Sequence, residues 1–523
     1  MARTHRGLVL LALLPLGFLV VFFAWPVAAI LGLGLGDGGV AEVLGQASTW
    51  RLAGFTVGQA AASTVLSVLA GLPIAFVLAR LKLPGVALVR TIVLVPFVLP
   101  TVVVGLAFRA LWPDGGVLSI VLANAFFNVA VVARTVGGLW SHLDRRAEEA
   151  ARALGASPWQ AFRSVTLPRL TPAILSASAV VFLFCSTSFG VVLILGGGRF
   201  RTLETEIYLR TVNLLDLSGA AALSLVQLLA VVAALVIGAL ARRRRETALH
   251  LRAAAESVRR PEGREWWVVA AAVAVLGLLL TPIVALLLKS SVAGFEGLAT
   301  TGGALPVSGW DAALRSLRTA TDATVLAMCV GVLASVVLVS LRRLPGRFAR
   351  GAGETMDAAL MLPLGVSAVT VGFGYLVTLD DLPGDLRTSP LLVPFAQALV
   401  IIPMIVRMVL PVLRSVDERL RQAAATLGAS PARVWREIDF PLAARSLVAA
   451  AGFGYVIALG EFGATSFLAR PGEPTLPVAI AALISRPGEL NSQMAYAACV
   501  LLMLLTAAVV MVIDRLGPST GEF

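Results

Sequence analysis

Few residues in this sequence have side chains suited to acid–base, nucleophilic or metal chemistry, and these few are dispersed. The three histidines lie far from one another and form no cluster of metal-ligating spacing. The three cysteines sit singly inside apolar segments without a C-x-x-C pair, so we interpret them as small buried apolar residues. These six residues are His5, His142, His250, Cys185, Cys329 and Cys499. A polytopic membrane enzyme, which needs a cluster of His, Asp or Glu at one membrane face, is therefore disfavoured.

A nucleotide-binding loop is also absent. The Walker A pattern G-x-x-x-x-G-K-[ST] needs a lysine between a glycine and a hydroxyl residue. Lys82 is followed by leucine, and Lys289 is followed by Ser290 but preceded by Leu288. We therefore expect no ATP hydrolysis by this chain, and any ATP-driven process would need a separate subunit.

The composition is that of a membrane protein. Hydrophobic residues make up 58% of the 523 residues, and the mean hydropathy is +0.90. Apolar stretches long enough to cross a bilayer recur from end to end, most clearly at 7–32 and 266–288. The first stretch follows a short basic start, but it is longer than the apolar part of a typical signal peptide, so we expect it to be a retained span.

The sequence predicts an all-α polytopic membrane protein. Spans are expected to be helical because an open strand would leave backbone polar groups unpaired in hydrocarbon. The apolar segments predict about twelve helices, near residues 7–32, 55–80, 88–112, 116–140, 170–196, 216–241, 266–290, 315–341, 355–379, 390–413, 443–469 and 488–514.

The net charge of +12 comes from basic residues that set the orientation of the spans, not from a surface that binds nucleic acid. Basic residues gather beside the ends of apolar segments, whereas the loop 378–390 is acidic and the loop 197–215 is a mild exception. Alternating the loops across twelve helices places the basic ones on one face together with both termini, and the positive-inside bias makes that face cytoplasmic. The basic loops are 79–90, 141–155, 241–264 and 341–351.

The second half of the chain repeats the first. The stretch "ALGASPWQAFRSVTLP" at 153–168 returns as "TLGASPARVWREIDFP" at 426–441, so that equivalent residues are 273 positions apart. We divide the chain into a first half (1–241), an Arg-rich cytoplasmic linker (242–264) and a second half (265–523). Six helices per half predict two repeats of the same orientation, with a pathway between them.

Each copy of the doubled segment carries the signals of a helix–turn–helix on the cytoplasmic face. In the first copy, residues 142–168, a stretch of strong helix formers ends at Gly155, which is suited to the left-handed residue after a helix. Ser157 and Pro158 are then an N-cap and first helical residue. We expect Pro168 to end the second short helix, just before the next span. A single copy is compatible with an ordinary surface loop, but two copies at the same place in each half predict a docking device.

The doubled segments resemble the EAA loop of the permeases of ATP-binding-cassette (ABC) importers. The pattern is E-A-A-x-x-x-G, nine residues, an aliphatic residue, any residue, and a hydrophobic-Pro pair. In the first half it is matched by Glu149, Ala150, Ala151, Gly155, Val165, Leu167 and Pro168. In the second half, at 415–441, it is matched by Gln422, Ala423, Ala424, Gly428, Ile438, Phe440 and Pro441, with Gln422 in place of the acid.

The resemblance extends over nearly the whole chain and implies its partners. It implies that residues 155–162 and 428–435 are coupling helices, each including a Ser-Pro pair (Ser157 and Pro158, Ser430 and Pro431), that sit in clefts on two copies of an ABC ATPase. It further implies that ATP and Mg are bound by that ATPase and not by this chain, and that an extracytoplasmic binding protein delivers the cargo. No nucleic-acid partner is expected.

The fused two-half form resembles the thiamine and iron(III) permease branch. The stretch 189–208, with its three glycines and Thr-x-Glu segment, is similar to thiamine permeases, which favours thiamine as cargo over ferric iron. The string "GEFGAT" at 460–465 also resembles sulfate and molybdate permeases, so it does not decide the substrate. A twelve-helix secondary transporter, which would need ion-coupling acids deep in its helices, is a further alternative.

Polar residues at membrane depth are the candidates for a translocation path. Glu461 is a possible partner for a cationic cargo, although capping a helix or contacting the binding protein is an alternative role. For Asn124 and Asn128 the alternative is interhelical hydrogen bonding. Ser186 and Ser188 either line the path or bond the backbone of their own helix.

Overall fold

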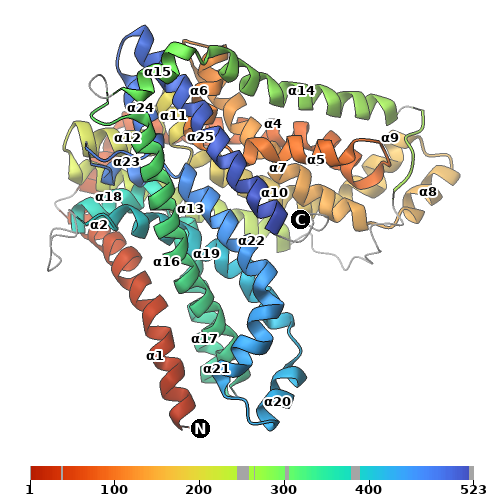
Figure 1. Cartoon of the computed structure of the whole chain (residues 1–523). Helices are drawn as coiled ribbons and strands as arrows, with labels where there is room; N and C mark the ends of the chain where they lie inside the picture. The colour runs from red at the N-terminus through yellow and green to blue at the C-terminus, as the bar shows by residue number, and fades with distance from the viewer. Residues whose placement is uncertain are drawn as a thin grey trace. The chain divides into compact units, whose positions relative to one another are not determined.

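The computed structural model describes residues 2–36, 39–243, 258–263, 265–300, 305–344, 346–378, 389–470 and 472–516 (Figure 1). Over these residues the chain is helical apart from one isolated β-bridge. Ten helical stretches are long and apolar enough to cross a membrane, and the number rises to twelve if each of two sharply bent helix pairs counts as one span. This confirms the all-α polytopic architecture expected from the sequence. Part of the linker, residues 244–257 and 264, lies outside the described residues.

The long helices follow the predicted apolar segments. The first is interrupted by one π-helical turn, Val20–Ala24, which divides α1 from α2. The long elements are α1 (Ala2–Leu19) with α2 (Trp25–Leu35), α4 (Ala47–Arg80), α7 (Val117–His142), α10 (Leu167–Ser186), α13 (Leu217–Arg243), α14 (Glu265–Lys289), α16 (Gly309–Arg343), α19 (Leu392–Ser415), α22 (Phe440–Gly460) and α25 (Glu489–Leu516).

The helices expected at 88–112 and 355–379 are each broken into two. In the first, α5 (Val86–Val98) and α6 (Thr101–Leu111) meet at 101°. Leu99 is extended because the ring of Pro100 disfavours helical backbone before it. In the second, residues Arg347–Gly365, which begin with α17 (Arg347–Met361), meet α18 (Ala368–Thr378) at 98°. There Ser367 Oγ accepts from the backbone N of Val369 at 3.0 Å and caps α18.

Two further predicted helices end earlier than expected and are followed by short ones. The segment predicted at 170–196 breaks after Ser186, and α11 (Gly190–Leu195) and α12 (Leu203–Tyr208) follow. The segment predicted at 443–469 breaks after Gly460, and α23 (Thr465–Leu468) and α24 (Leu476–Ser485) follow. Both breaks fall next to polar or glycine-containing sequence, where the apolar pattern gave no boundary.

The chain forms two compact units that cut across the two halves of the sequence. Unit 1 comprises residues 1–40, 207–225 and 291–523, and unit 2 comprises 41–206 and 226–290. Thus α1 and α2 belong to the unit made mostly of the second half, where they pack against α16 and α18. Conversely, α14 packs against α4, α5 and α6 in unit 2. Each unit therefore contains the first helix of the other half.

In unit 1, α2 is held by an aromatic contact just before it and by close packing against α18. Phe22, in the π turn before α2, stacks on Phe395 with ring centroids 4.5 Å apart. A Cβ added to Gly374 of α18 would lie 2.8 Å from the Cβ of Pro26 on α2. In unit 2, Gly71 of α4 likewise faces Val132 of α7, where an added Cβ would be 2.7 Å away. These glycines let helices pack with little space between them.

We expect Gly374→Leu to destabilise unit 1 by about 1–3 kcal/mol, because the added side chain overlaps Pro26 and forces the helices apart. The melting temperature of the detergent-purified protein measures this loss. Gly32→Leu is the matched control, since an added Cβ there meets nothing within 4 Å. Equal melting temperatures for the two variants would contradict the proposed close packing.

Candidate functional site

The two copies of the doubled segment fold in the same way, element by element. We call residues 144–166 the first elbow and residues 417–439 the second elbow. The first contains α8 (Arg146–Ala153), α9 (Pro158–Ala161) and a π-helical turn, Phe162–Thr166, that leads into α10. The second contains α20 (Glu418–Thr426), α21 (Pro431–Val434) and the π-helical turn Trp435–Asp439, which leads into α22.

The turn in each elbow is a glycine-terminated helix end. Gly155 has φ +91° and Gly428 has φ +83°, the left-handed backbone for which glycine is suited. In the first elbow Gly155 N donates to Arg152 O at 3.0 Å and Ala156 N donates to Ala151 O at 3.1 Å. The second elbow repeats both bonds at the equivalent positions. This is the Schellman arrangement, so the expected helix ends at Gly155 and Gly428 are present in the structure.

The second short helix of each elbow begins at the expected serine. Ser157 Oγ accepts from Gln160 N at 3.3 Å, and Gln160 Oε1 accepts from Ser157 N at 2.8 Å, which is a complete capping box. Ser430 Oγ accepts from Arg433 N at 3.4 Å. The first helical residues are Pro158 and Pro431.

The expected helix end at Pro168 is wrong. The chain runs as one helical stretch from Pro158 to Ser186, and the second copy runs from Pro431 to Gly460. In each copy a π turn comes directly before the Leu-Pro or Phe-Pro pair, and Leu167 N donates to Phe162 O across it. The wider turn relieves the clash that a proline ring makes with the preceding helical carbonyls. Pro168 and Pro441 are thus the second residues of the long helices α10 and α22.

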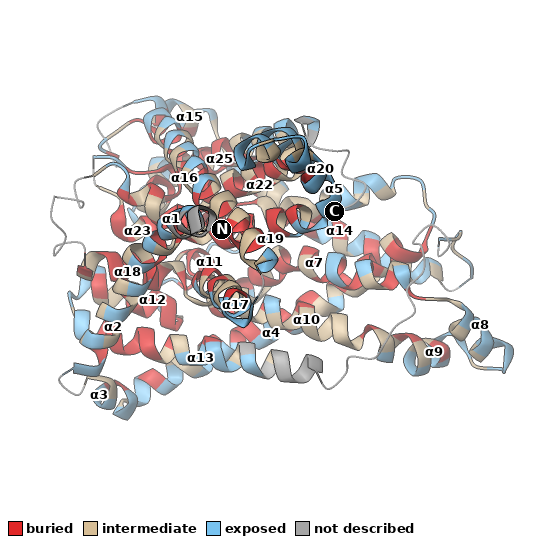
Figure 2. Ribbon diagram, turned by 90° about the horizontal axis from the view of Figure 1, so that it is seen from below, coloured by how far each residue is buried: buried red, intermediate tan, exposed pale blue. Residues whose placement is uncertain are grey.

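The tips of the elbows present apolar and small residues. Leu154 is 90% exposed and the equivalent Leu427 is 88% exposed. Trp159, on α9, is 66% exposed. Figure 2 shows α8 of the first elbow mostly in the colour of exposed residues, and none of its residues is buried. Within unit 1, Figure 1 shows α20 and α21 beyond the ends of α19 and α22, at the end that also holds α17 and the N-terminus. Large apolar side chains exposed at the same position in two repeats favour contact with a partner over a solvated loop.

The E-A-A residues lie on α8 and α20. Glu149 is exposed and forms an ion pair with Arg145, with Nη2 and Oε1 3.6 Å apart. Gln422 is exposed at the equivalent position. The first alanine of each pair, Ala150 and Ala423, is exposed, whereas the second, Ala151 and Ala424, is half-buried.

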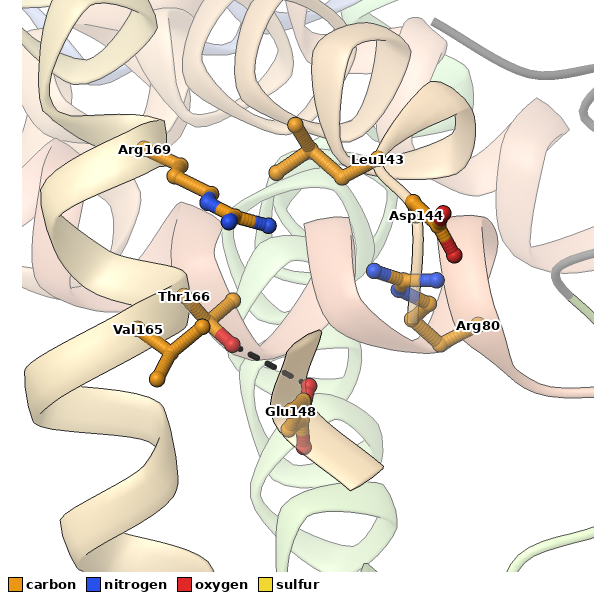
Figure 3. Close-up of a pocket in the computed structure, with 7 residues that line it drawn as sticks. All are labelled: Arg80, Leu143, Asp144, Glu148, Val165, Thr166 and Arg169. Atoms are coloured by element: carbon orange, nitrogen blue, oxygen red, sulfur yellow. Dashed lines mark hydrogen bonds between the residues drawn. The ribbon is translucent and has the colours of Figure 1, made fainter. Parts of the chain in front are cut away.

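Each elbow is also held at its base by polar contacts that the sequence did not predict. In the first, Thr166 Oγ1 donates to Glu148 Oε2 at 3.0 Å. These two residues line a cavity of about 10 Å³, room for one water, together with Arg80, Asp144 and Arg169 (Figure 3). Arg80 is 6% exposed, and among the described residues its Nη1 has no hydrogen-bond partner.

The base of the second elbow is held by Arg421, which is 6% exposed. Its Nε donates to Asp439 Oδ1 at 2.6 Å and its Nη1 to Glu418 Oε2 at 3.0 Å. It also donates to the backbone oxygens of Leu413 and Val416, at 3.0 and 3.3 Å. Aligning the two copies at the 273-residue offset could have identified these residues. Glu148 then aligns with Arg421 and Thr166 with Asp439, so each copy has a polar pair at the same two positions.

Three of the candidate path residues meet inside unit 2. Asn124 Nδ2 donates to Gln59 Oε1 at 2.9 Å, and Ser188 Oγ donates to Asn124 Oδ1 at 2.7 Å. Asn128 Nδ2 donates to Asn124 O at 2.9 Å and lies 3.4 Å from Cys185 Sγ. The network joins α4 and α7 to the end of α10, and Gln59 is the member that the sequence analysis missed.

The remaining two candidates bond locally. Ser186 Oγ donates to Leu183 O, one turn earlier in α10, at 2.8 Å. In unit 1, the buried carboxylate of Glu461 accepts from the backbone N of Ala464 at 2.8 Å and of Thr465 at 3.0 Å. It also accepts from the hydroxyl of Thr465. Glu461 therefore caps the start of α23.

The Thr-x-Glu segment forms the start of α12 in unit 2. Glu206 pairs with Arg201 at 3.2 Å, and buried Glu204 accepts from Gln227 Nε2 at 3.1 Å. Within the described residues, no group of three or more His, Cys, Asp or Glu side chains could hold a metal ion.

The elbows and the repeated spans define the class of protein. Residues 71–246 and 327–519 each match the family model of the binding-protein-dependent transport system inner membrane component. The two matches cover more than half of the chain, and the chain therefore belongs to this family. It is a multi-pass inner-membrane protein and the permease part of such a system, not the catalytic part.

Known permeases are similar over most of this chain. The thiamine transport system permease protein ThiP of Brucella abortus is 28% identical over 496 residues, covering 90% of this chain and 89% of the relative. That of Escherichia coli is 28% identical over 490 residues, covering 89% of each. The molybdenum transport system permease protein ModB of Mycobacterium tuberculosis is 38% identical over 201 residues, covering 35% of this chain and 75% of the relative.

Proposed function

We propose that this chain is the permease of an ATP-driven importer that passes a small solute, with thiamine favoured, from a binding protein into the cytoplasm. The observation that carries the coupling role is the pair of matched elbows with exposed leucines at equivalent positions. Each elbow docks in a cleft on one of two ABC ATPase copies, which bind ATP and Mg. Both termini and the linker lie on the cytoplasmic side with the elbows.

Transport follows from movement of the elbows. Closure of the ATPases on ATP pushes the elbows and opens the path between the two repeats towards the binding protein. The cargo enters, and hydrolysis returns the path to its inward-open state. This chain contributes the elbows, the path and the coupling between them.

Thiamine is favoured because relatives named as thiamine permeases match about nine-tenths of this chain, with similar coverage of their own length. The named molybdenum permease matches about a third of it. Iron(III) is the next candidate, followed by a sulfate or molybdate oxyanion.

For the path we propose the polar group of α7 and α10 in unit 2, comprising Asn124, Asn128, Ser186 and Ser188, and in unit 1 Glu461. These are polar side chains near membrane depth, where such groups are costly unless they serve a function or are satisfied by partners. Interhelical bonding and helix capping are the competing roles, and the hydrogen bonds of Asn124 and Glu461 support them.

The test is uptake into vesicles that contain the permease with its ATPase, supplied with its binding protein. We expect ATP-dependent uptake of labelled thiamine, and little uptake of ferric iron or molybdate. Uptake that persists without the ATPase would favour the secondary transporter instead. ATP-dependent uptake of another cargo would overturn the thiamine assignment and leave the coupling role intact.

A further inference from the structure

The polar residues that hold the two elbows differ in charge at equivalent positions. At the 273-residue offset, the basic Arg145 is replaced by Glu418, the acidic Glu148 by Arg421, and Thr166 by Asp439. Glu148 and Arg421 directly precede the E-A-A position, and Thr166 and Asp439 fill the unspecified position before the hydrophobic-Pro pair. The motif therefore constrains none of the three, yet in both copies the last two bond to each other.

The contacts of Arg421 join three elements of unit 1. Leu413 belongs to α19, Arg421 to α20, and Asp439 to the π turn that begins α22. An arginine fork can donate in several directions at once, and here it links the incoming span, the elbow and the outgoing span. Arg343, at the end of α16, adds a fourth element through an ion pair with Glu418, with Nε and Oε2 3.2 Å apart.

The corresponding group in unit 2 is less direct. Glu148 on α8 contacts Thr166 in the π turn, and Arg80 at the end of α4 and Asp144 after α7 share the small cavity with them (Figure 3). A cavity of this size admits a water that could satisfy Arg80 and one of the acids. We define the first clasp as Arg80, Asp144, Glu148 and Thr166, and the second clasp as Arg343, Glu418, Arg421 and Asp439.

The structure assigns the two clasps as positioning groups that make each elbow move as one body with its spans, so that a push from the ATPase reaches the path. This rests on the coupling role proposed above. The second short helix of each elbow continues into the outgoing span, whereas α8 or α20 is joined to it along the chain only through the glycine turn. Without the clasp, α8 or α20 would rotate without moving the span, because coupling needs elements that are rigidly connected. The second clasp, with more direct bonds, couples more tightly than the first.

The test measures cargo transported per ATP hydrolysed by the complete complex. Asp439→Asn keeps the size of the side chain but removes the charge that Arg421 contacts. We expect its ATPase to remain bound while transport per ATP falls about fivefold or more, the lower end of typical coupling between sites. Thr166→Val, in the first clasp, should give a smaller fall. An unchanged ratio for Asp439→Asn would overturn the assignment.

A charge-exchange variant distinguishes the loss of a positioning contact from a general loss of structure. Arg421→Glu alone places three acids together, and we expect transport to fall at least about tenfold. Adding Asp439→Arg exchanges the two charges of the bond between α20 and the π turn and leaves Glu418 paired with Arg343. We expect this double variant to recover most of the lost coupling. A double variant no better than Arg421→Glu would overturn the assignment.

Failure of the clasp assignment can be distinguished from failure of the proposed coupling role. Substituting the exposed leucines at the elbow tips tests docking, and the clasp variants test transmission after docking. If the tip variants still bind the ATPase normally, the coupling role fails. If they lose the ATPase while Asp439→Asn retains full transport per ATP, only the clasp assignment fails.

Discussion

Replacing both Leu154 and Leu427 by Asp is expected to abolish assembly with the ATPase and reduce ATP-dependent transport to background. These side chains are 90% and 88% exposed, so the substitutions should leave the fold of the permease intact. A carboxylate placed in an apolar contact costs about 2 kcal/mol or more at each elbow, roughly 30-fold in affinity per site. Co-purification of the ATPase with the tagged permease measures the effect.

The matched control is the replacement of both leucines by Met, which keeps the apolar character and flexible reach of the side chain. We expect this variant to retain the ATPase and most of the transport rate. An unchanged melting temperature for the Asp variant would confirm that the loss lies in docking. ATPase retained by the Asp variant at wild-type yield would contradict the role of the elbow tips.

Glu461→Leu is expected to be the most destabilising of the single substitutions at candidate path residues. It leaves the buried N–H groups of Ala464 and Thr465 and the Thr465 hydroxyl without their acceptor. Each buried group left unpaired costs about 1–3 kcal/mol, so we expect the three together to cost about 3 kcal/mol or more. The melting temperature of the purified protein should fall, and transport with it.

Glu461→Gln distinguishes helix capping from an action on the cargo. Glutamine keeps one acceptor oxygen, so we expect partial recovery of the melting temperature and transport that recovers in step. A Gln variant as stable as the wild type that transports thiamine at less than about a tenth of its rate would show that the charge acts on the cargo. A Leu variant as stable as the wild type would contradict the capping role.

The features that could be predicted from the sequence depend on local signals. The apolar segments locate the spans because hydrocarbon leaves few alternatives to a helix. Gly155 and Gly428 end their helices, and Ser157 and Ser430 begin the next ones, because these choices depend on backbone geometry within a few residues. The 273-residue repeat made these local expectations apply twice.

The features that could not be predicted depend on contacts between distant residues. The sequence predicts a helix end at Pro168, but a π turn accommodates the proline, and no local pattern distinguishes these outcomes. The hydrogen bond between Arg421 and Asp439, in the second clasp, joins residues in different elements of the second elbow. The breaks next to Pro100 and Ser367 had local causes, but the continuous apolar pattern concealed them.

The exchange of first helices has a consequence for biosynthesis. A growing chain emerges from its N-terminus, yet α1 packs mostly against α16 and α2 mostly against α18, which belong to the second half of the chain. Unit 2 is likewise incomplete until α14 has been inserted. The nascent protein can therefore pack α4, α7 and α10 against one another early, but neither unit is complete until the second half arrives, so products truncated before α14 lack part of both units.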